Sequence, residues 1–265
     1  MIGAIIGDFC GSIYERRSVK WDGQTPPGVG ACRLTDDSVL TFATAETILS
    51  GQTGAEDFAR SYMRWARDYP GRGYGRGFSG WVEAGELTKN GSFGNGSAMR
   101  VSPVGWAAGT LDKALDLAKT SAEYTHGHPE GIKGAQAVAG GIFLLRSGAT
   151  NDELKYWVES TFGYDLSGTV RQIAAGYRFD SSCQGSVPQA IMCFLEADSF
   201  EGAIKNAFLL NGDVDTQADM AAALAQVRFG VPAELRTLAE KAMDDRMKKV
   251  LSAFESRFVD ALTAR

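Results

Sequence analysis

The sequence has no long hydrophobic run and no concentration of charge of one sign. Its apolar stretches fall short of the roughly 20 residues that a membrane-spanning helix requires, so we expect no membrane partner. The 27 basic and 32 acidic residues give a formal net charge of −5, and neither sign forms a long run. Because nucleic-acid-binding proteins depend on clustered Lys and Arg, we expect no nucleic-acid partner either.

Cysteine and histidine are scarce as well. The four cysteines are scattered without a Cys-x-x-Cys pair: Cys10, Cys32, Cys183 and Cys193. This spacing argues against a disulfide framework or a structural zinc site and favours a cytoplasmic location. The first residues lack the basic segment of a signal peptide and reach an acid at Asp8, so we expect no signal peptide. Both histidines lie in Thr125-His-Gly-His-Pro129, where substrate contact and a structural hydrogen bond are equally good explanations.

The hydrophobic spacing predicts an all-α fold, with residues 1–265 forming a single domain. Val, Ile and Thr do not form the alternating runs from which a sheet is built. Apolar residues instead recur at helical spacing, which predicts helices over about 2–15, 35–50, 54–68, 111–122, 131–146, 151–160, 168–177, 187–195, 199–208, 216–229 and 233–262. Two irregular stretches remain, 18–34 and 69–97. The second has nine glycines between Gly71 and Gly96, and long loops inside compact domains are usually functional.

The predicted helix 2–15 has two unusual features. Gly3, Gly7 and Gly11 are spaced four apart, so they predict a groove in which another helix can approach the backbone closely. Asp8 and Glu15 are seven apart and would project from nearly the same face of this helix. Two acids on an otherwise apolar helix need partners or a cation.

Two acidic clusters open predicted helices, Leu34-Thr-Asp-Asp-Ser38 and Asn211-Gly-Asp-Val-Asp-Thr216. One interpretation is capping, since Thr is a good N-cap and acids suit the positive end of a helix dipole. The other is that both starts converge on cations. Four carboxylates would balance two divalent ions, and two threonines would add neutral oxygens, an all-oxygen set that selects Mg²⁺ or Mn²⁺ over zinc. The spacing alone leaves both interpretations open.

The loop Asn90–Ser97 is rich in glycine and in hydrogen-bonding side chains. Its glycines allow successive backbone N–H groups to point into one concavity that suits phosphate oxygens. Ser92, Asn95 and Ser97 add polar groups, and Phe93 adds a ring. An ordinary surface loop is the alternative. Arg72-Gly-Tyr-Gly-Arg-Gly77 also holds a Gly-x-Gly-x-Gly pattern, but no strand precedes it, so it is a weak dinucleotide signal.

Five motifs in order resemble the ADP-ribosylglycohydrolase family, also called the dinitrogenase-reductase-activating glycohydrolase family. They are Gly7-Asp-Phe-Cys-Gly-Ser-Ile-Tyr-Glu15, Leu34-Thr-Asp-Asp-Ser38, Ser92-Phe-Gly-Asn-Gly-Ser-Ala-Met-Arg100, Thr125-His-Gly-His-Pro129 and Gly212-Asp-Val-Asp-Thr216. Each is weak alone, whereas the ordered set is specific and spans nearly the whole chain. The first motif and Arg72-Gly-Tyr-Gly75 are most similar to the ADP-ribosylserine hydrolase branch. Four positions depart from the family pattern: Asn211 replaces a glycine, Val214 a threonine, Gln217 an isoleucine and Asp219 a small apolar residue.

The resemblance implies a compact orthogonal helical bundle with a cleft that holds two Mg²⁺ ions, with Mn²⁺ as an alternative. It implies that Glu15, Asp36 and Asp37 are catalytic. It implies metal ligation by Thr35, Asp36, Asp37, Asp213, Asp215 and Thr216. It implies ADP-ribose binding by Gly91, Ser92, Phe93, Gly94, Asn95, Gly96, Ser97 and His126, with the diphosphate on the backbone amides of the loop.

The activity implied is hydrolysis of the glycosidic bond at C1″ of ADP-ribose attached to a protein side chain. The partner would be an ADP-ribosylated protein or a small molecule that contains ADP-ribose, and we expect a monomer. Two alternatives from the same resemblance stay open. The cleft would also accept O-acetyl-ADP-ribose or ADP-ribose oligomers, and a non-catalytic family member would bind ADP-ribose without cleaving it.

Overall fold

The chain folds as an all-α bundle, as the hydrophobic spacing predicts. The computed structural model describes residues 1–15 and 19–260, and these contain fifteen helices, two isolated β-bridges and no strand. The helices are α1 (Ile2–Gly11), α2 (Asp36–Ser50), α3 (Ala55–Asp68), α4 (Arg76–Ala84), α5 (Gly96–Met99), α6 (Ser102–Ala107), α7 (Leu111–Ala122), α8 (Pro129–Arg146), α9 (Asn151–Phe162), α10 (Val170–Ala174), α11 (Cys183–Leu195), α12 (Phe200–Leu210), α13 (Val214–Phe229), α14 (Ala233–Lys241) and α15 (Asp245–Phe258).

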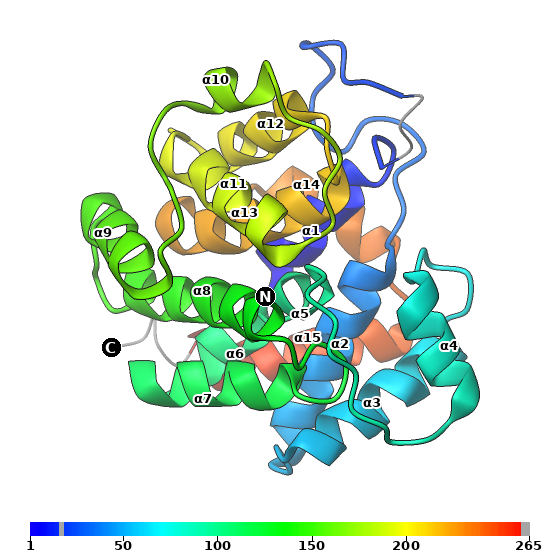
Figure 1. Cartoon of the computed structure of the whole chain (residues 1–265). Helices are drawn as coiled ribbons and strands as arrows, with labels where there is room; N and C mark the ends of the chain where they lie inside the picture. The colour runs from blue at the N-terminus through cyan, green and yellow to red at the C-terminus, as the bar shows by residue number, and fades with distance from the viewer. Residues whose placement is uncertain (16–18, 261–265) are drawn as a thin grey trace.

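Helices α1 and α13 form the centre of the bundle. Every residue of α1 is buried, and α13 is buried from Val214 to Gln226. Helix α13 packs against α1, α8, α11 and α12, and Figure 1 shows α1 and α13 side by side. A methyl group on Gly3 would lie 2.5 Å from the Ala222 carbonyl oxygen, and one on Gly11 would lie 2.5 Å from the Asp215 Cα. The glycine spacing therefore brings two helix backbones together, as the sequence predicts.

A larger side chain in this contact should be strongly destabilising. A methyl group on Gly7 would overlap the backbone carbonyl of Ala218, which cannot rotate away. We expect Gly7→Ala to lower the free energy of unfolding by about 3 kcal/mol or more, measured by urea denaturation. The matched control is Gly80→Ala in α4, where nothing lies within 4 Å of the added methyl group. That change should raise stability by up to about 1 kcal/mol. Equal effects of the two changes would contradict the close helix contact.

The prediction that the first helix extends to residue 15 is wrong. Helix α1 ends at Gly11, where the Ser12 hydroxyl donates to the Phe9 carbonyl oxygen at 2.8 Å. The same hydroxyl accepts from the Arg33 backbone N–H at 3.0 Å, so it competes with continuation of the helix. Asp8 and Glu15 consequently do not share a helical face, because Glu15 lies outside the helix. Their seven-residue spacing therefore does not determine how the two side chains are oriented.

Several other predicted boundaries are also wrong. Stretch 69–97, expected to be irregular, contains α4 and the start of α5, and neither α5 nor α6 was predicted. Helix α10 is shorter than the predicted 168–177, and α11 begins at Cys183 rather than 187, because the Ser182 hydroxyl caps it by accepting from Gly185 N–H at 3.1 Å. The predicted helix 233–262 is two helices, since Asp244 caps α15 by accepting from Met247 N–H at 2.9 Å. Residues 261–262 of that prediction lie outside the described residues.

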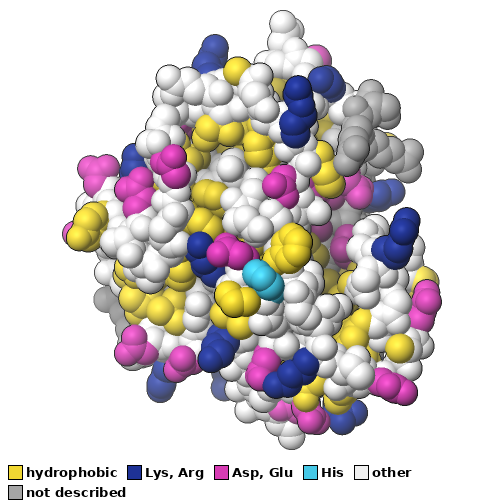
Figure 2. All heavy atoms as spheres, viewed as in Figure 1, with side chains coloured by type: hydrophobic (Ala, Val, Ile, Leu, Met, Phe, Trp, Pro, Cys, Tyr) yellow, Lys and Arg dark blue, Asp and Glu magenta, His cyan; other side chains and the backbone are white. Residues whose placement is uncertain are grey.

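The surface agrees with the balanced composition. On the face shown in Figure 2, Lys and Arg are interspersed with Asp and Glu, and neither sign forms a broad patch. Among the described helices, none is both long and apolar enough to cross a membrane. All four cysteines are free thiols, and three of them are buried.

Candidate active site

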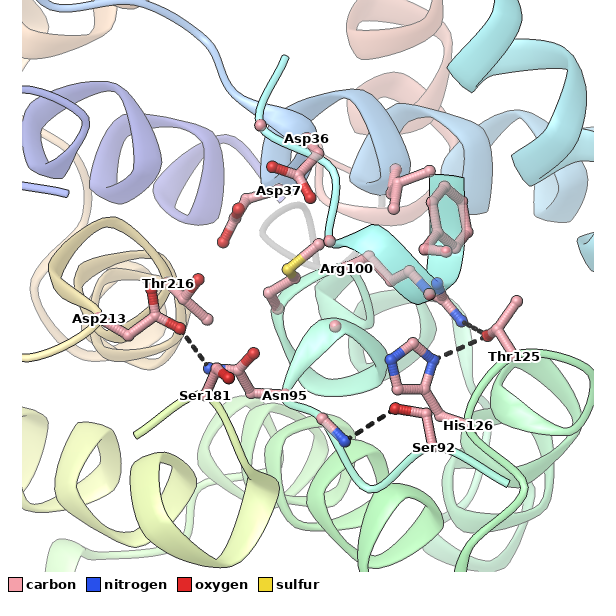
Figure 3. Close-up of a pocket in the computed structure, with 18 of the residues that line it drawn as sticks. Asp36, Asp37, Ser92, Asn95, Arg100, Thr125, His126, Ser181, Asp213 and Thr216 are labelled. Atoms are coloured by element: carbon pink, nitrogen blue, oxygen red, sulfur yellow. Dashed lines mark hydrogen bonds between the residues drawn. The ribbon is translucent and has the colours of Figure 1, made fainter. Parts of the chain in front are cut away.

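A cavity of about 470 Å³ lies between the starts of α2 and α13 on one side and the loop before α5 on the other. Figure 3 shows Asp36 and Asp37 on one side of it and Thr125 and His126 on the other. The lining includes eleven of the residues proposed from the sequence: Glu15, Asp36, Asp37, Ser92, Gly94, Asn95, Gly96, His126, Asp213, Asp215 and Thr216. Four proposed residues are not part of the lining: Thr35, Gly91, Phe93 and Ser97. The fold thus brings together segments as far apart in the chain as Glu15 and Thr216.

The start of α2 is held by Asp8 on the neighbouring helix α1. The Asp8 carboxylate accepts from the Thr35 backbone N–H at 3.0 Å and from the Thr35 hydroxyl at 2.6 Å. It also accepts from the backbone N–H and the hydroxyl of Ser38. Thr35 is the N-cap, as the capping interpretation predicts, and its hydroxyl accepts from Asp37 N–H at 3.4 Å. These bonds fix the orientation of the first turn of α2, which carries the Asp36 and Asp37 side chains.

Three buried aspartates from three helices meet at this end of the cavity. Asp8, Asp37 and Asp215 each place a carboxylate oxygen within 4.8 Å of the other two. One oxygen of Asp37 has no hydrogen-bond partner, and among the described residues none of these three carboxylates forms an ion pair. Buried carboxylates this close repel one another unless protons or a cation intervene. An all-oxygen group of this kind suits a hard divalent cation.

Burial also changes the protonation of the aspartates around this group. Burial, followed by the nearby Asp8 charge, raises the pKa of Asp36 to about 8. Burial raises the pKa of Asp213 to about 6, although the Asn95 side chain opposes that rise by donating to the Asp213 carboxylate at 2.7 Å. The pKa values of Asp37 and Asp215 are raised as well, first by burial and then by neighbouring aspartates. Without a bound cation, these aspartates therefore keep protons at pH values where exposed aspartates are ionised.

Glu15 lines the cavity beyond the end of α1, and its side chain is partly exposed. Its carboxylate forms an ion pair with Arg33 at 3.0 Å. The turn that contains Gly73 lies next to it, and the Arg72 carbonyl oxygen accepts from the Asp36 backbone N–H at 3.1 Å. A methyl group on Gly73 would lie 3.0 Å from the Asp36 carboxylate and 3.5 Å from that of Glu15. Gly73 thus leaves room beside the acidic group.

A methyl group at position 73, beside the Asp36 and Glu15 carboxylates, should reduce activity without unfolding the protein. Gly73 has a φ of +110° and Gly71 has a φ of +74°, so alanine at either position strains the backbone. Nothing lies within 4 Å of a methyl group on Gly71, which makes Gly71→Ala the matched control. We expect each change to cost about 1 kcal/mol of stability, and only Gly73→Ala to lower kcat/KM, by about tenfold or more. Equal kcat/KM values for the two variants would contradict this placement.

The loop on the far side of the cavity is fixed by bonds within the protein. The Gly94 N–H donates to the Ser92 hydroxyl at 3.1 Å, and the Asn95 N–H donates to the Ser181 carbonyl oxygen at 2.8 Å. The Ser97 hydroxyl donates to the Gly131 carbonyl oxygen at 2.6 Å. Two backbone amides expected to hold phosphate are therefore already bonded. Phe93 is half exposed, with its ring 5.5 Å from that of His128.

Several cavity residues were missing from the sequence-based site. Phe78 and Trp81 form a wall on α4, with stacked or tilted ring contacts that run from Tyr74 to Phe78 to Trp81. Their spacing of four and three residues is a helical stripe that was hidden by the surrounding glycines. Arg100 and Ser181 also line the cavity.

Two of the four departures from the family pattern, Gln217 and Asp219, have different surroundings. The Gln217 side chain donates to the Tyr177 hydroxyl at 2.8 Å, and that hydroxyl donates to the Gly185 carbonyl oxygen at 2.5 Å. Gln217 therefore ties α13 to the segment before α11. Asp219 is fully buried, and neither of its carboxylate oxygens has a hydrogen-bond partner among the described residues.

Comparison with known proteins agrees with this arrangement. The family model described as ADP-ribosylglycohydrolase matches residues 1–263. Similar curated proteins include the ADP-ribosylhydrolase ARH3 of Homo sapiens, which is 25% identical over 87% of this chain and 84% of its own length. The ADP-ribosylhydrolase ARH3 of Danio rerio is 24% identical over 87% of this chain and 82% of its own length. A solved structure titled "ADP-ribosylglycohydrolase-related protein complex" has the same fold, with a TM-score of 0.71 and 23% identity over 96% of this chain and 93% of that one. The chain belongs to the ADP-ribosylglycohydrolase family and is a glycosidic-bond hydrolase.

Proposed function

We propose that this protein hydrolyses the glycosidic bond at C1″ of ADP-ribose attached to a protein side chain. The observation that carries the proposal is the layout of one cavity. Buried Asp37 of α2 and Asp215 of α13 line one side, with Asp8 of α1 next to them, and a polar glycine loop lies at the other side. A molecule with a ribose at one end and a diphosphate further along matches that layout. The relatives named as ADP-ribosylhydrolases support the same activity.

The acidic side of the cavity is where we place the reacting ribose and two Mg²⁺ ions. The proposed ligands are Thr35, Asp36, Asp37, Asp213, Asp215 and Thr216. The donor set fits, because it consists only of oxygens and includes the unpartnered oxygen of buried Asp37. Bound divalent ions would orient the ribose hydroxyls and stabilise the charge that develops as the bond to C1″ breaks.

The chain's own residues supply position and proton transfer. Asp8 holds the start of α2, and the loop residue Asn95 donates to the Asp213 carboxylate, which fixes the acidic side relative to the loop. Attack of water at an oxocarbenium-like C1″ requires a nearby base. Glu15, Asp36 and Asp37 are the carboxylates on the cavity wall that we assign to that proton transfer. The loop residues, with His126, would hold the diphosphate.

Release of ADP-ribose from a defined panel tests this proposal. The panel carries ADP-ribose on a serine peptide, on an arginine peptide and as an ADP-ribose oligomer, together with O-acetyl-ADP-ribose, each with Mg²⁺ and with EDTA. We expect Mg²⁺-dependent release from a peptide, with serine as the first candidate because of the motif similarity. Release only from the oligomer or from O-acetyl-ADP-ribose would replace the protein substrate with that compound. Binding of ADP-ribose without any release would identify a non-catalytic binder.

A further inference from the structure

A buried arginine, a threonine and a histidine form a chain of hydrogen bonds behind the glycine loop. Arg100 follows α5 and is fully buried, and its guanidinium Nη2 donates to the Thr125 hydroxyl oxygen at 2.6 Å. That hydroxyl oxygen lies 2.8 Å from Nδ1 of His126. Figure 3 shows both bonds, with the second ring nitrogen of His126 turned the opposite way, towards the middle of the cavity.

The donor in the second bond follows from the first. Arginine has only donors, so the Thr125 oxygen is the acceptor of the Arg100 bond. A hydroxyl has a single hydrogen, and no other partner of the Thr125 hydroxyl occurs among the described residues. The buried hydrogen is satisfied when it points at an unprotonated His126 Nδ1. If His126 Nδ1 were the donor instead, the Thr125 hydroxyl hydrogen would have no partner. The Nδ1–H would also point at an oxygen that already accepts from the positively charged Arg100 guanidinium.

The remaining proton of a neutral imidazole is then on Nε2. This nitrogen faces the loop, because a methyl group on Gly96 would lie 2.9 Å from it and one on Gly94 would lie 3.7 Å from it. Arg100 also disfavours a second positive charge at the ring. Burial, followed by the Arg100 charge, keeps the pKa of His126 well below its usual value.

We infer that Arg100 and Thr125 are positioning residues that fix His126 as the neutral tautomer with a hydrogen on Nε2, so that His126 presents a donor to the ligand at the glycine loop. The step to a ligand rests on the proposed function, whereas the tautomer does not. Arg100 is suited to this role because a guanidinium stays protonated. Its contact with the face of the Tyr62 ring, 3.9 Å from the guanidinium carbon to the ring centroid, keeps it in place.

Long-range ¹H–¹⁵N spectra of the imidazole rings in ¹⁵N-labelled full-length protein test the tautomer directly. The chain has only two histidines, and the exposed His128 is identified by its loss in His128→Gln. We expect His126 at neutral pH to show a protonated Nε2 and an unprotonated Nδ1. Thr125→Val should abolish this single tautomer, and Thr125→Ser should retain it because the hydroxyl is kept. A protonated Nδ1 in the unchanged protein, or an unaltered tautomer in Thr125→Val, would overturn the inference.

Titration with ADP-ribose, using the same variants, tests the link to the ligand. In Thr125→Val the His126 Nε2 hydrogen is no longer held towards the ligand, so ADP-ribose binding should weaken about threefold to tenfold. Thr125→Ser keeps the hydroxyl, and its affinity should stay within about twofold of that of the unchanged protein. In a turnover assay the loss should appear in KM with little change in kcat, because Nε2 would contact a part of the substrate away from C1″. Unaltered affinity in Thr125→Val would overturn the positioning role. Failure of the unchanged protein to bind ADP-ribose would refute the proposed function, while the tautomer would still be read from the spectra.

Discussion

Asp37→Asn is expected to abolish hydrolysis while leaving the protein folded. Asparagine has the shape of aspartate without its charge, so the change removes a cation ligand and keeps the packing. The Asp37 carboxylate, one oxygen of which has no hydrogen-bond partner, lies in the group formed with Asp8 and Asp215, so its charge matters most once a cation is bound. We expect kcat to fall by at least about a hundredfold, the size of loss found when one preorganised electrostatic group is removed from an active site. The measurement is ADP-ribose release from the best substrate of the panel.

Although Asp37→Asn should lose activity, it should not lose stability. Without divalent ions, Asp37 stands among like charges, so Asp37→Asn should be as stable as the unchanged protein in EDTA or more stable. Asp116→Asn, on the exposed face of α7, is the matched control and should change neither activity nor stability appreciably. Full turnover by Asp37→Asn would refute the assignment of Asp37. Lost activity together with lost folding would show that Asp37 is a structural residue.

The second large effect expected is a strong dependence of stability on pH and Mg²⁺. Asp36 has an ordinary pKa of 3.8 in an unfolded chain and about 8 in the folded protein, and Asp213 rises from 3.8 to about 6. The folded state therefore binds more protons than the unfolded state between these values. By linkage, the free energy of unfolding in EDTA should fall as the pH rises from about 4 to about 8.

Mg²⁺ should reverse that loss at the upper end of the pH range. A cation that binds only the folded state at about 100 times its Kd adds about 2.7 kcal/mol. For a chain of this size that corresponds to a rise in Tm of roughly 5–10 °C. The rise should be larger at pH values near 8 than near 5, because the carboxylates are then ionised. Thermal unfolding in EDTA and in Mg²⁺, at matched ionic strength, provides the measurement.

Asp37→Asn is the control for this effect and should show a much smaller rise in Tm with Mg²⁺. A rise that is the same at low and high pH, or that NaCl reproduces at equal ionic strength, would indicate general screening of charge. Either result would contradict a specific cation site among the aspartates.

Local sequence patterns anticipated the fold class and the order of the motifs. Helical spacing of apolar residues, the Thr35 cap and the glycines of α1 are local signals that act within a few residues or along one helix face. The helix ends were predicted less well. The Ser12 and Ser182 hydroxyls decide two of them, and each forms side-chain bonds that compete with or begin a helix irrespective of hydrophobic spacing.

In the candidate site too, residues marked by local sequence signals were found, and residues that depend on distant contacts were not. Charge and residue type alone pointed to Asp36, Asp37, Asp213 and Asp215 and to a polar glycine loop, and the resemblance favoured ligand contact over a structural hydrogen bond for His126. The role of Asp8 in holding the start of α2 was not apparent from the sequence, since it depends on bonds to residues 27 and 30 positions away. The aromatic wall of Phe78 and Trp81 was missed because glycines obscured the helix that carries it.

By itself, then, the sequence determined the chemical inventory: an all-α chain with two acidic helix starts, a polar glycine loop and no basic patch. Only the tertiary structure decided which of these groups share one cavity and which are already bonded within the protein. The reason is physical, because the close contact of α1 with α13 and the hydrogen bonds of Asp8 and Arg100 join residues distant in the chain. Composition and spacing specify which groups are available, whereas their distances and hydrogen bonds depend on the packed fold.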